Sequence, residues 1–161
     1  TIASNKLYML PNATPYHFGI LCSTMHNAFM RTVAGRLESR YQYSNGVVYN
    51  NFPFPFAPQS EGRSAQAAEQ KHRAAIEAAA QSVLDARAFY RQEAEQEGLP
   101  PPSLADLYRP DAPFTRLHQA HRALDKAVDA AYGYKGGHDD GSRTAFLFAL
   151  YQKIAAEAGK R

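Results

Sequence analysis

Apolar residues recur every three or four positions in the first part of the chain, from Phe18 to Val33. This spacing places them on one side of an α-helix and predicts an amphipathic helix. Thr14 and Pro15 mark its start, because threonine caps helix N-termini and proline is favoured at the first helical position. Gly35 marks its end. We therefore expect one continuous helix between these residues.

The segment after this helix has the pattern of a β-hairpin. Asn45-Gly46 is the dipeptide best suited to a tight type I′ turn, and β-branched and aromatic residues flank it on both sides. Side chains along the incoming strand alternate between two faces, one polar and one that we expect to pack its tyrosines on the preceding helix. The polar face consists of Glu38, Arg40, Gln42 and Ser44, and the other of Ser39, Tyr41 and Tyr43. The return strand does not repeat this alternation, so the hairpin is better defined than its register.

Three amphipathic helices are expected in the remaining hundred residues, at 64–97, 111–132 and 142–158. Gly98 is placed to stop the first, and Ser103 and Asp106 have the spacing of a capping box between the first two. The apolar residues expected to be buried by the last helix are Phe146, Leu147, Leu150, Tyr151 and Ile154.

These patterns predict a mainly α protein with a small β-hairpin, an α+β fold. The polar stretch after the Pro- and Phe-rich segment at 52–58 suggests a boundary. We expect a helix-hairpin recognition segment at 1–58 and a small helical bundle as the C-terminal domain at 59–161. A short strand is also expected at 6–10.

The chain has a formal net charge of +3, and its first 60 residues hold all of this excess, with four basic residues against one glutamate. This asymmetry is consistent with a polyanion partner at the front of the chain. The single Cys22 lies in an apolar run and is interpreted as a core residue in a reducing compartment. Without an apolar stretch long enough for a membrane span, the sequence favours a cytoplasmic protein. Because it begins at Thr1 and not at Met, we expect it to be part of a longer protein.

Two clusters resemble metal sites, but neither is complete. His118 and His121 share a helix face without a third ligand at a suitable spacing. Asp139 and Asp140 are better explained as negative groups at a helix N-terminus. Asn51-Phe52-Pro53-Phe54 differs from the amine-binding Asn-Pro-Pro-Tyr motif of methyltransferases at its second position. The sequence therefore predicts no catalytic residue, no metal and no cofactor in this chain.

Glu38 and Arg40 suggest base recognition. On one strand they point the same way, and together they have the chemistry to read a C·G pair: glutamate accepts from the cytosine amine, and arginine donates to guanine in a fork. The plain alternative is a solvated surface ion pair that contributes well under about 1 kcal/mol. Spacing alone leaves both interpretations open.

Several longer stretches resemble one family. They include Pro11-Asn12-Ala13-Thr14-Pro15-Tyr16, Arg31-Thr32-Val33-Ala34-Gly35-Arg36-Leu37, Val48-Tyr49-Asn50-Asn51-Phe52-Pro53, Leu104-Ala105-Asp106-Leu107-Tyr108 and Leu124-Asp125-Lys126-Ala127-Val128-Asp129. In this order they resemble the end of the target-recognition region and the C-terminal helical domain of the MmeI-like family, large bacterial DNA adenine methyltransferases that are often fused to a restriction nuclease. The long alanine-rich helix and the loop at 136–137 depart from that pattern.

The resemblance implies that the S-adenosylmethionine site and the catalytic motif lie upstream in a parent protein, with which this part packs. The part itself would read double-stranded DNA and not methylate it. The family's recognition segment varies at two positions after the Gly-Arg-Leu signature, where pairs of charged residues are thought to read one base pair, and here these positions hold Glu38 and Arg40. Arg31 and Arg36 would contact phosphates, and Gln42, Ser44 and Asn45 complete the expected DNA-binding set. The alternative function is a helical protein-protein interaction module without DNA specificity.

Overall fold

The computed structural model describes residues 8–56 and 63–158. Residues 57–62, which include the boundary expected between 58 and 59, and the first two residues of the strand expected at 6–10 lie outside these ranges; the described Tyr8–Leu10 form no strand. The predicted mainly α fold with one small hairpin is confirmed. Its elements are α1 (Pro15–Cys22), α2 (Thr24–Val33), β1 (Gly35–Leu37), β2 (Arg40–Gln42), the π-helical turn η1 (Asn45–Tyr49), α3 (Arg63–Gln96), α4 (Leu104–Leu107), α5 (Thr115–Tyr132) and α6 (Asp140–Ala158).

The helix expected between Thr14 and Gly35 is in fact two helices, with the break at Ser23. The predicted start at Pro15 is confirmed, and the imidazole of His17 accepts a hydrogen bond from the backbone N–H of Thr14. The Ser23 hydroxyl donates to the Ile20 carbonyl at 2.7 Å and accepts from the His26 N–H at 3.2 Å. One serine therefore ends α1 and caps α2, and it lets the chain change direction.

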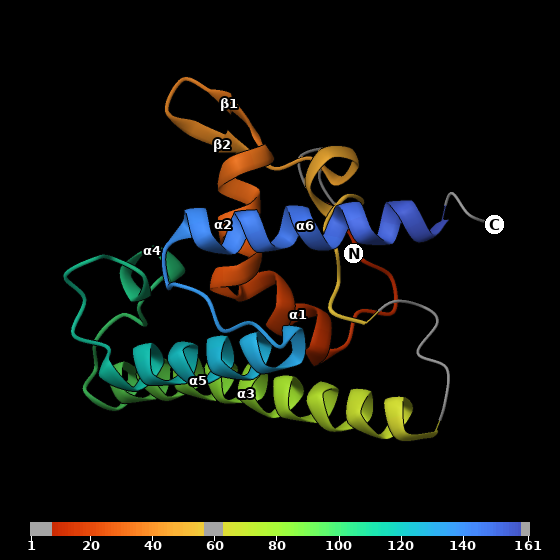
Figure 1. Cartoon of the computed structure of the whole chain (residues 1–161). Helices are drawn as coiled ribbons and strands as arrows, with labels where there is room; N and C mark the ends of the chain where they lie inside the picture. Colours follow the sequence, from red (N-terminus) through yellow and green to blue (C-terminus); the bar gives the residue numbers. More distant parts are fainter. Residues whose placement is uncertain (1–7, 57–62, 159–161) are drawn as a thin grey trace.

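Helices α3 and α5 lie side by side, and α1 packs across them (Figure 1). As expected for amphipathic helices, their buried contact is apolar, and it includes Ile76, Ala80, Val83, Leu117, Leu124 and Val128. Gly19 of α1 sits at the crossing, where an added Cβ would lie 2.7 Å from the Ile76 side chain. The missing side chain therefore permits the close approach of α1 to α3.

The helix ends follow local chemistry. Gly98 and Gly133 adopt positive φ of 70° and 63° just after α3 and α5, the left-handed conformation that glycine tolerates best. The capping box of Ser103 and Asp106 is present at the start of α4. Helix α5 begins at Thr115, later than the expected 111, because Pro113 disfavours helical backbone in the residue before it.

Helix α6 crosses α2 (Figure 1). Of the five residues expected to be buried, Leu147 is fully buried, whereas Tyr151 is 43% exposed. That part of the prediction was wrong, because α6 packs mainly on the single helix α2 and leaves a wide face to solvent. The residues it buries instead are polar: Arg143, which pairs with Asp129, and Thr144.

The core is continuous through the described residues. Tyr16, Ile20 and Phe29 from the first helices belong to the same buried cluster as the apolar residues of α3, α5 and α6. The first two helices and the later ones are therefore one packed body, from which the hairpin projects at the far end of α2 (Figure 1).

Candidate nucleic-acid interface

The hairpin consists of β1 and β2, which pair antiparallel with Arg36 opposite Tyr41 and Leu37 opposite Arg40. Its two-residue turn is Glu38-Ser39, so the expected turn at Asn45-Gly46 is wrong. The register places Arg40 and Gln42 on one face of β2 as predicted, while Glu38 lies in the turn and not on the strand. All six strand residues are exposed.

The segment expected as the return strand instead forms η1. Val48 is 0% exposed and packs in the core, and its N–H donates to the Ser44 carbonyl at 2.8 Å. The Asn51 amide donates to the carbonyl oxygens of Gly46 and Val47 and closes the turn. A return strand would have kept the Val48 side chain on an exposed ribbon. The free energy gained by burying it in the core therefore outweighs the local preference of Asn45-Gly46 for a hairpin turn.

The turn is conformationally unusual, because Glu38 has a φ of 57°. A positive φ is uncommon for a residue with a side chain and costs on the order of 1–3 kcal/mol. The Glu38 carboxylate nevertheless meets the Arg40 guanidinium, at 3.0 Å, and both side chains are 75% exposed. The expected proximity of this acceptor and this donor therefore occurs, through a turn and not through strand alternation.

The opposite face of the hairpin carries Arg36 and Tyr41. The Arg36 guanidinium lies 4.5 Å from the centre of the Tyr41 ring and donates to its hydroxyl at 3.0 Å. This cross-strand pair holds the arginine side chain along the ribbon with its charge in solvent. The arrangement leaves this charge free to contact an anionic group such as a phosphate.

The remaining predicted residues differ in their placement. Gln42 is exposed at the end of β2, opposite Gly35. Ser44 is partly buried just before η1, and Asn45 is exposed with its side-chain oxygen accepting from the Gly46 N–H at 2.8 Å. The structure therefore brings Arg36, Glu38, Arg40 and Gln42 together on the hairpin and places Ser44 and Asn45 beyond it.

Arg31 does not lie on the hairpin. At the end of α2 it makes a two-pronged ion pair with Asp140, with Nε–Oδ2 at 2.6 Å and a second bond at 2.8 Å. The guanidinium hydrogen bonds hold the pKa of Asp140 below its ordinary value, and those to the carboxylate raise the pKa of Arg31. The pair links α2 to α6 through two residues that are 109 positions apart in the sequence.

Sequence reasoning missed His26, which anchors the segment leaving the hairpin. Its Nε2 lies 3.1 Å from the hydroxyl of Tyr43, as expected for a tyrosine packing on the preceding helix. His26 is 2% exposed, and burial lowers its pKa to about 4, so the imidazole is neutral near pH 7. Its position four residues after Cys22 was the available signal, since it continues the apolar stripe.

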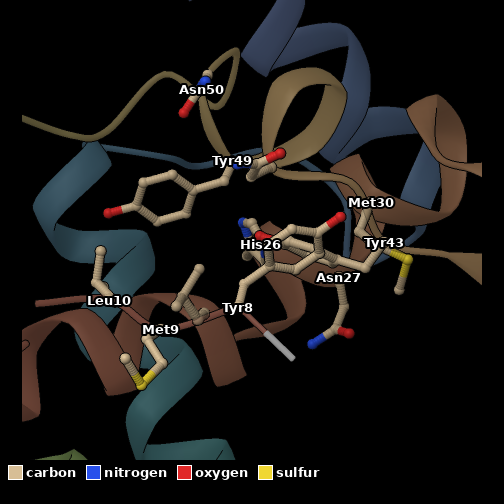
Figure 2. Close-up of a pocket in the computed structure, with 11 residues that line it drawn as sticks. Tyr8, Met9, Leu10, His26, Asn27, Met30, Tyr43, Tyr49 and Asn50 are labelled. Atoms are coloured by element: carbon tan, nitrogen blue, oxygen red, sulfur yellow. The ribbon is translucent and has the colours of Figure 1, made fainter. Parts of the chain in front are cut away.

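The same two residues border an open pocket of about 600 Å³ next to η1 (Figure 2). Its wall combines apolar, tyrosine and asparagine side chains, including Met9, Met30, Asn27 and Tyr49. The Nδ1 atom of His26 has no hydrogen-bond partner within the described ranges. The pocket therefore lies beside the hairpin's exit but does not include its turn.

The other ionisable clusters are structural. Asp139 accepts from the N–H and hydroxyl of Ser142 and caps α6, as predicted. The His121 ring contacts the Tyr108 hydroxyl at 2.7 Å, and this hydroxyl also accepts from Arg87. Within residues 8–56 and 63–158, no group of three His, Cys, Asp or Glu side chains is arranged to hold a metal ion. No helix in these ranges is long and apolar enough to cross a membrane.

Comparison with known proteins gives one consistent result. Residues 1–56 match the MmeI target recognition domain, and residues 68–158 match the MmeI C-terminal domain. The chain is 36% identical over 154 residues to DNA methyltransferase A of Bacillus subtilis (strain 168), covering 96% of this chain and 15% of that protein.

A solved structure agrees with these sequence matches. It is that of the Type IIL restriction-modification enzyme MmeI in complex with DNA, which matches with a TM-score of 0.72 and 44% identity, over 91% of this chain and 17% of that one. The chain thus spans about a sixth of the length of these relatives. It belongs to the MmeI family, in which it corresponds to the target recognition and C-terminal domains.

Proposed function

We propose that this chain is the DNA-reading part of an S-adenosylmethionine-dependent DNA adenine methyltransferase or restriction-modification enzyme. Its role is to recognise a sequence on double-stranded DNA in the cytoplasm. An upstream domain of the same protein binds the cofactor and transfers the methyl group. Membership of the MmeI family and the DNA-bound state of the similar MmeI structure support this proposal.

The observation that carries the proposal is the exposed hairpin turn with Glu38 and Arg40 at its end. The two side chains lie 3.0 Å apart and are each 75% exposed. A projecting two-stranded ribbon fits the major groove, which is about 12 Å wide. The positive φ of Glu38 is a local strain of the kind that persists where function requires a particular side-chain direction.

The chemistry of the pair matches the edges of one base pair. Glutamate accepts a hydrogen bond from the cytosine amine, and arginine donates two to guanine. Because the ion pair is solvent-exposed, separating its two members to contact bases costs little, well under about 1 kcal/mol. We assign direct base contacts to Glu38 and Arg40, a phosphate contact to Arg36, and supporting DNA contacts to Gln42, Ser44 and Asn45.

The test exchanges the roles of the pair. In the full-length protein, Glu38→Lys combined with Arg40→Asp should exchange the base pair preferred at one position of the methylated motif, since each good contact discriminates by about 1–3 kcal/mol. The measurement is the methylated-adenine motif from single-molecule sequencing. A matched control is Arg109→Asp with Asp111→Arg, an exposed ion pair between α4 and α5, which should leave the motif unchanged.

Two other outcomes would count against the proposal. An unchanged motif with normal methylation would reduce Glu38 and Arg40 to a surface ion pair. If the protein bound no DNA and its partner binding were insensitive to salt, the chain would instead be an interaction module, because phosphate contacts make DNA affinity fall steeply with salt.

A further inference from the structure

The hairpin has few contacts that could fix its direction. Its strands are exposed along their whole length, and its own side chains pair mainly with one another. It is joined to the body through the end of α2, where Val33 is followed by Ala34 and Gly35, and through Tyr43 on its exit side. Where the turn points therefore depends on how firmly the end of α2 is held.

Helix α6 holds that end through contacts one helical turn apart. Asp140, Thr144 and Phe148 are spaced by four residues and so share one face of α6. Asp140 binds Arg31, the Thr144 hydroxyl lies 3.2 Å from that of Thr32, and the Phe148 ring lies 6.1 Å from that of Phe29. The face crosses the last turn of α2, which leads into the hairpin.

The ion pair is the directional contact of the three. Two parallel hydrogen bonds from one guanidinium to one carboxylate fix orientation as well as distance. Asp140 is the first residue of α6, where the positive end of the helix dipole holds a carboxylate in place. Arg31 lies four residues before Gly35, so a shift at this contact is passed directly to β1.

We propose that Arg31 and Asp140 are positioning residues, through which helix α6 of the C-terminal domain sets the direction of the hairpin and thereby its selectivity for one base pair. This inference rests on the proposed DNA-reading function. It gives the C-terminal domain a part in recognition without a DNA contact of its own, and it replaces the phosphate contact expected for Arg31. Base-edge hydrogen bonds require heavy-atom distances of about 2.7–3.2 Å, so a small change in hairpin direction is enough to lose them.

The experiment uses Arg31→Lys, Asp140→Asn and the double variant in the full-length protein. Lysine keeps the positive charge but cannot form the two-pronged pair, so a phosphate contact would survive this change while the positioning contact would not. Three quantities are measured. The first is the discrimination ratio, which is methylation at the preferred motif divided by methylation at a motif in which the base pair assigned to Glu38 and Arg40 is changed. The others are the salt dependence of DNA affinity and the melting temperature. Arg109→Lys, at an exposed ion pair elsewhere, is the matched control.

Each single variant should reduce the discrimination ratio about tenfold at that one base pair and leave the slope of affinity against salt unchanged. The double variant should be no worse than either single one, because both break the same contact. Discrimination at other positions of the motif and the control variant should match the original protein. A loss confined to one base pair separates positioning from general destabilisation, which would lower methylation at every site.

Three results would overturn the inference. Unchanged discrimination in both single variants would make the pair purely structural. If Asp140→Asn strengthened DNA binding, and an additional charge-removing variant, Arg31→Gln, lowered the salt slope by about one, Arg31 would be a phosphate contact. If the original protein showed no discrimination at any base pair, the proposed function itself would fall, and this inference with it.

Discussion

The hairpin and the helical core are built on opposite principles. In the core, Ile76, Leu117 and Leu124 are each 0% exposed, and the helices meet closely enough to exclude a Cβ at Gly19. In the hairpin, Leu37 is 55% exposed and the ion pair at the tip lies in solvent. Stability resides in the first region, because buried apolar area dominates folding. The second region is free to contact a partner and can change sequence at little cost in stability.

This contrast implies that the hairpin can change its side chains independently of the core. Side chains of the hairpin make few contacts with the body, so replacing them leaves the core intact. Tyr43 and His26 connect the two regions directly, while Arg31 and Asp140 join α6 to the end of α2 that leads into the hairpin. Changes there should act on both stability and direction of the hairpin.

The two regions should differ most in the stability lost when a leucine is truncated to alanine. Leu124→Ala should lower the free energy of unfolding by about 2–5 kcal/mol, since it removes a fully buried side chain and leaves a cavity. Leu37→Ala in the exposed strand should change it by less than about 0.5 kcal/mol. Urea unfolding of the two variants measures both values. Similar losses would show that the hairpin is part of the stabilising core.

Glycines allow a second comparison. Gly19→Ala should cost about 1–3 kcal/mol, because its Cβ would lie 2.7 Å from Ile76 and 3.2 Å from both Ala80 and Leu124. Gly35→Ala at the base of the hairpin meets nothing within 4 Å and should be nearly neutral. Thermal melting of both variants provides the test. An unaffected Gly19→Ala would mean that α1 does not pack closely on α3 and α5.

The stability of the protein should depend on pH through His26, which contacts the segment leaving the hairpin. Its pKa is lowered to about 4 from 6.5 by burial, so below pH 6.5 the unfolded state takes up a proton that the folded state does not. The resulting stability is complete above pH 6.5 and is lost progressively down to pH 4, by about 1–2 kcal/mol at pH 5. Urea unfolding between pH 4 and 8 measures it. His26→Gln, which cannot titrate, should flatten this part of the curve; an equally steep curve would assign the effect to other groups.

The sequence determined the elements whose signals are local. The stop of α3 at Gly98 and the capping box of Ser103 and Asp106 depend on residues within one turn of each other. The stripes of α3 and α5 repeat over many turns, so their buried faces could be read from periodicity alone. For the site, local sequence signals were sufficient to predict that Glu38 and Arg40 lie close together, but not to predict the Glu38-Ser39 turn that places them so.

Only the tertiary structure decided the features that depend on distant partners. The Asn45-Gly46 turn was displaced because Val48 gains more from burial in the core than from a place on an exposed ribbon. The ion pair of Arg31 could not be predicted because its carboxylate partner is 109 residues further along the chain, beyond any local pattern. Packing and ion pairing act between positions that only the fold brings together, whereas capping and periodicity act within a single helix.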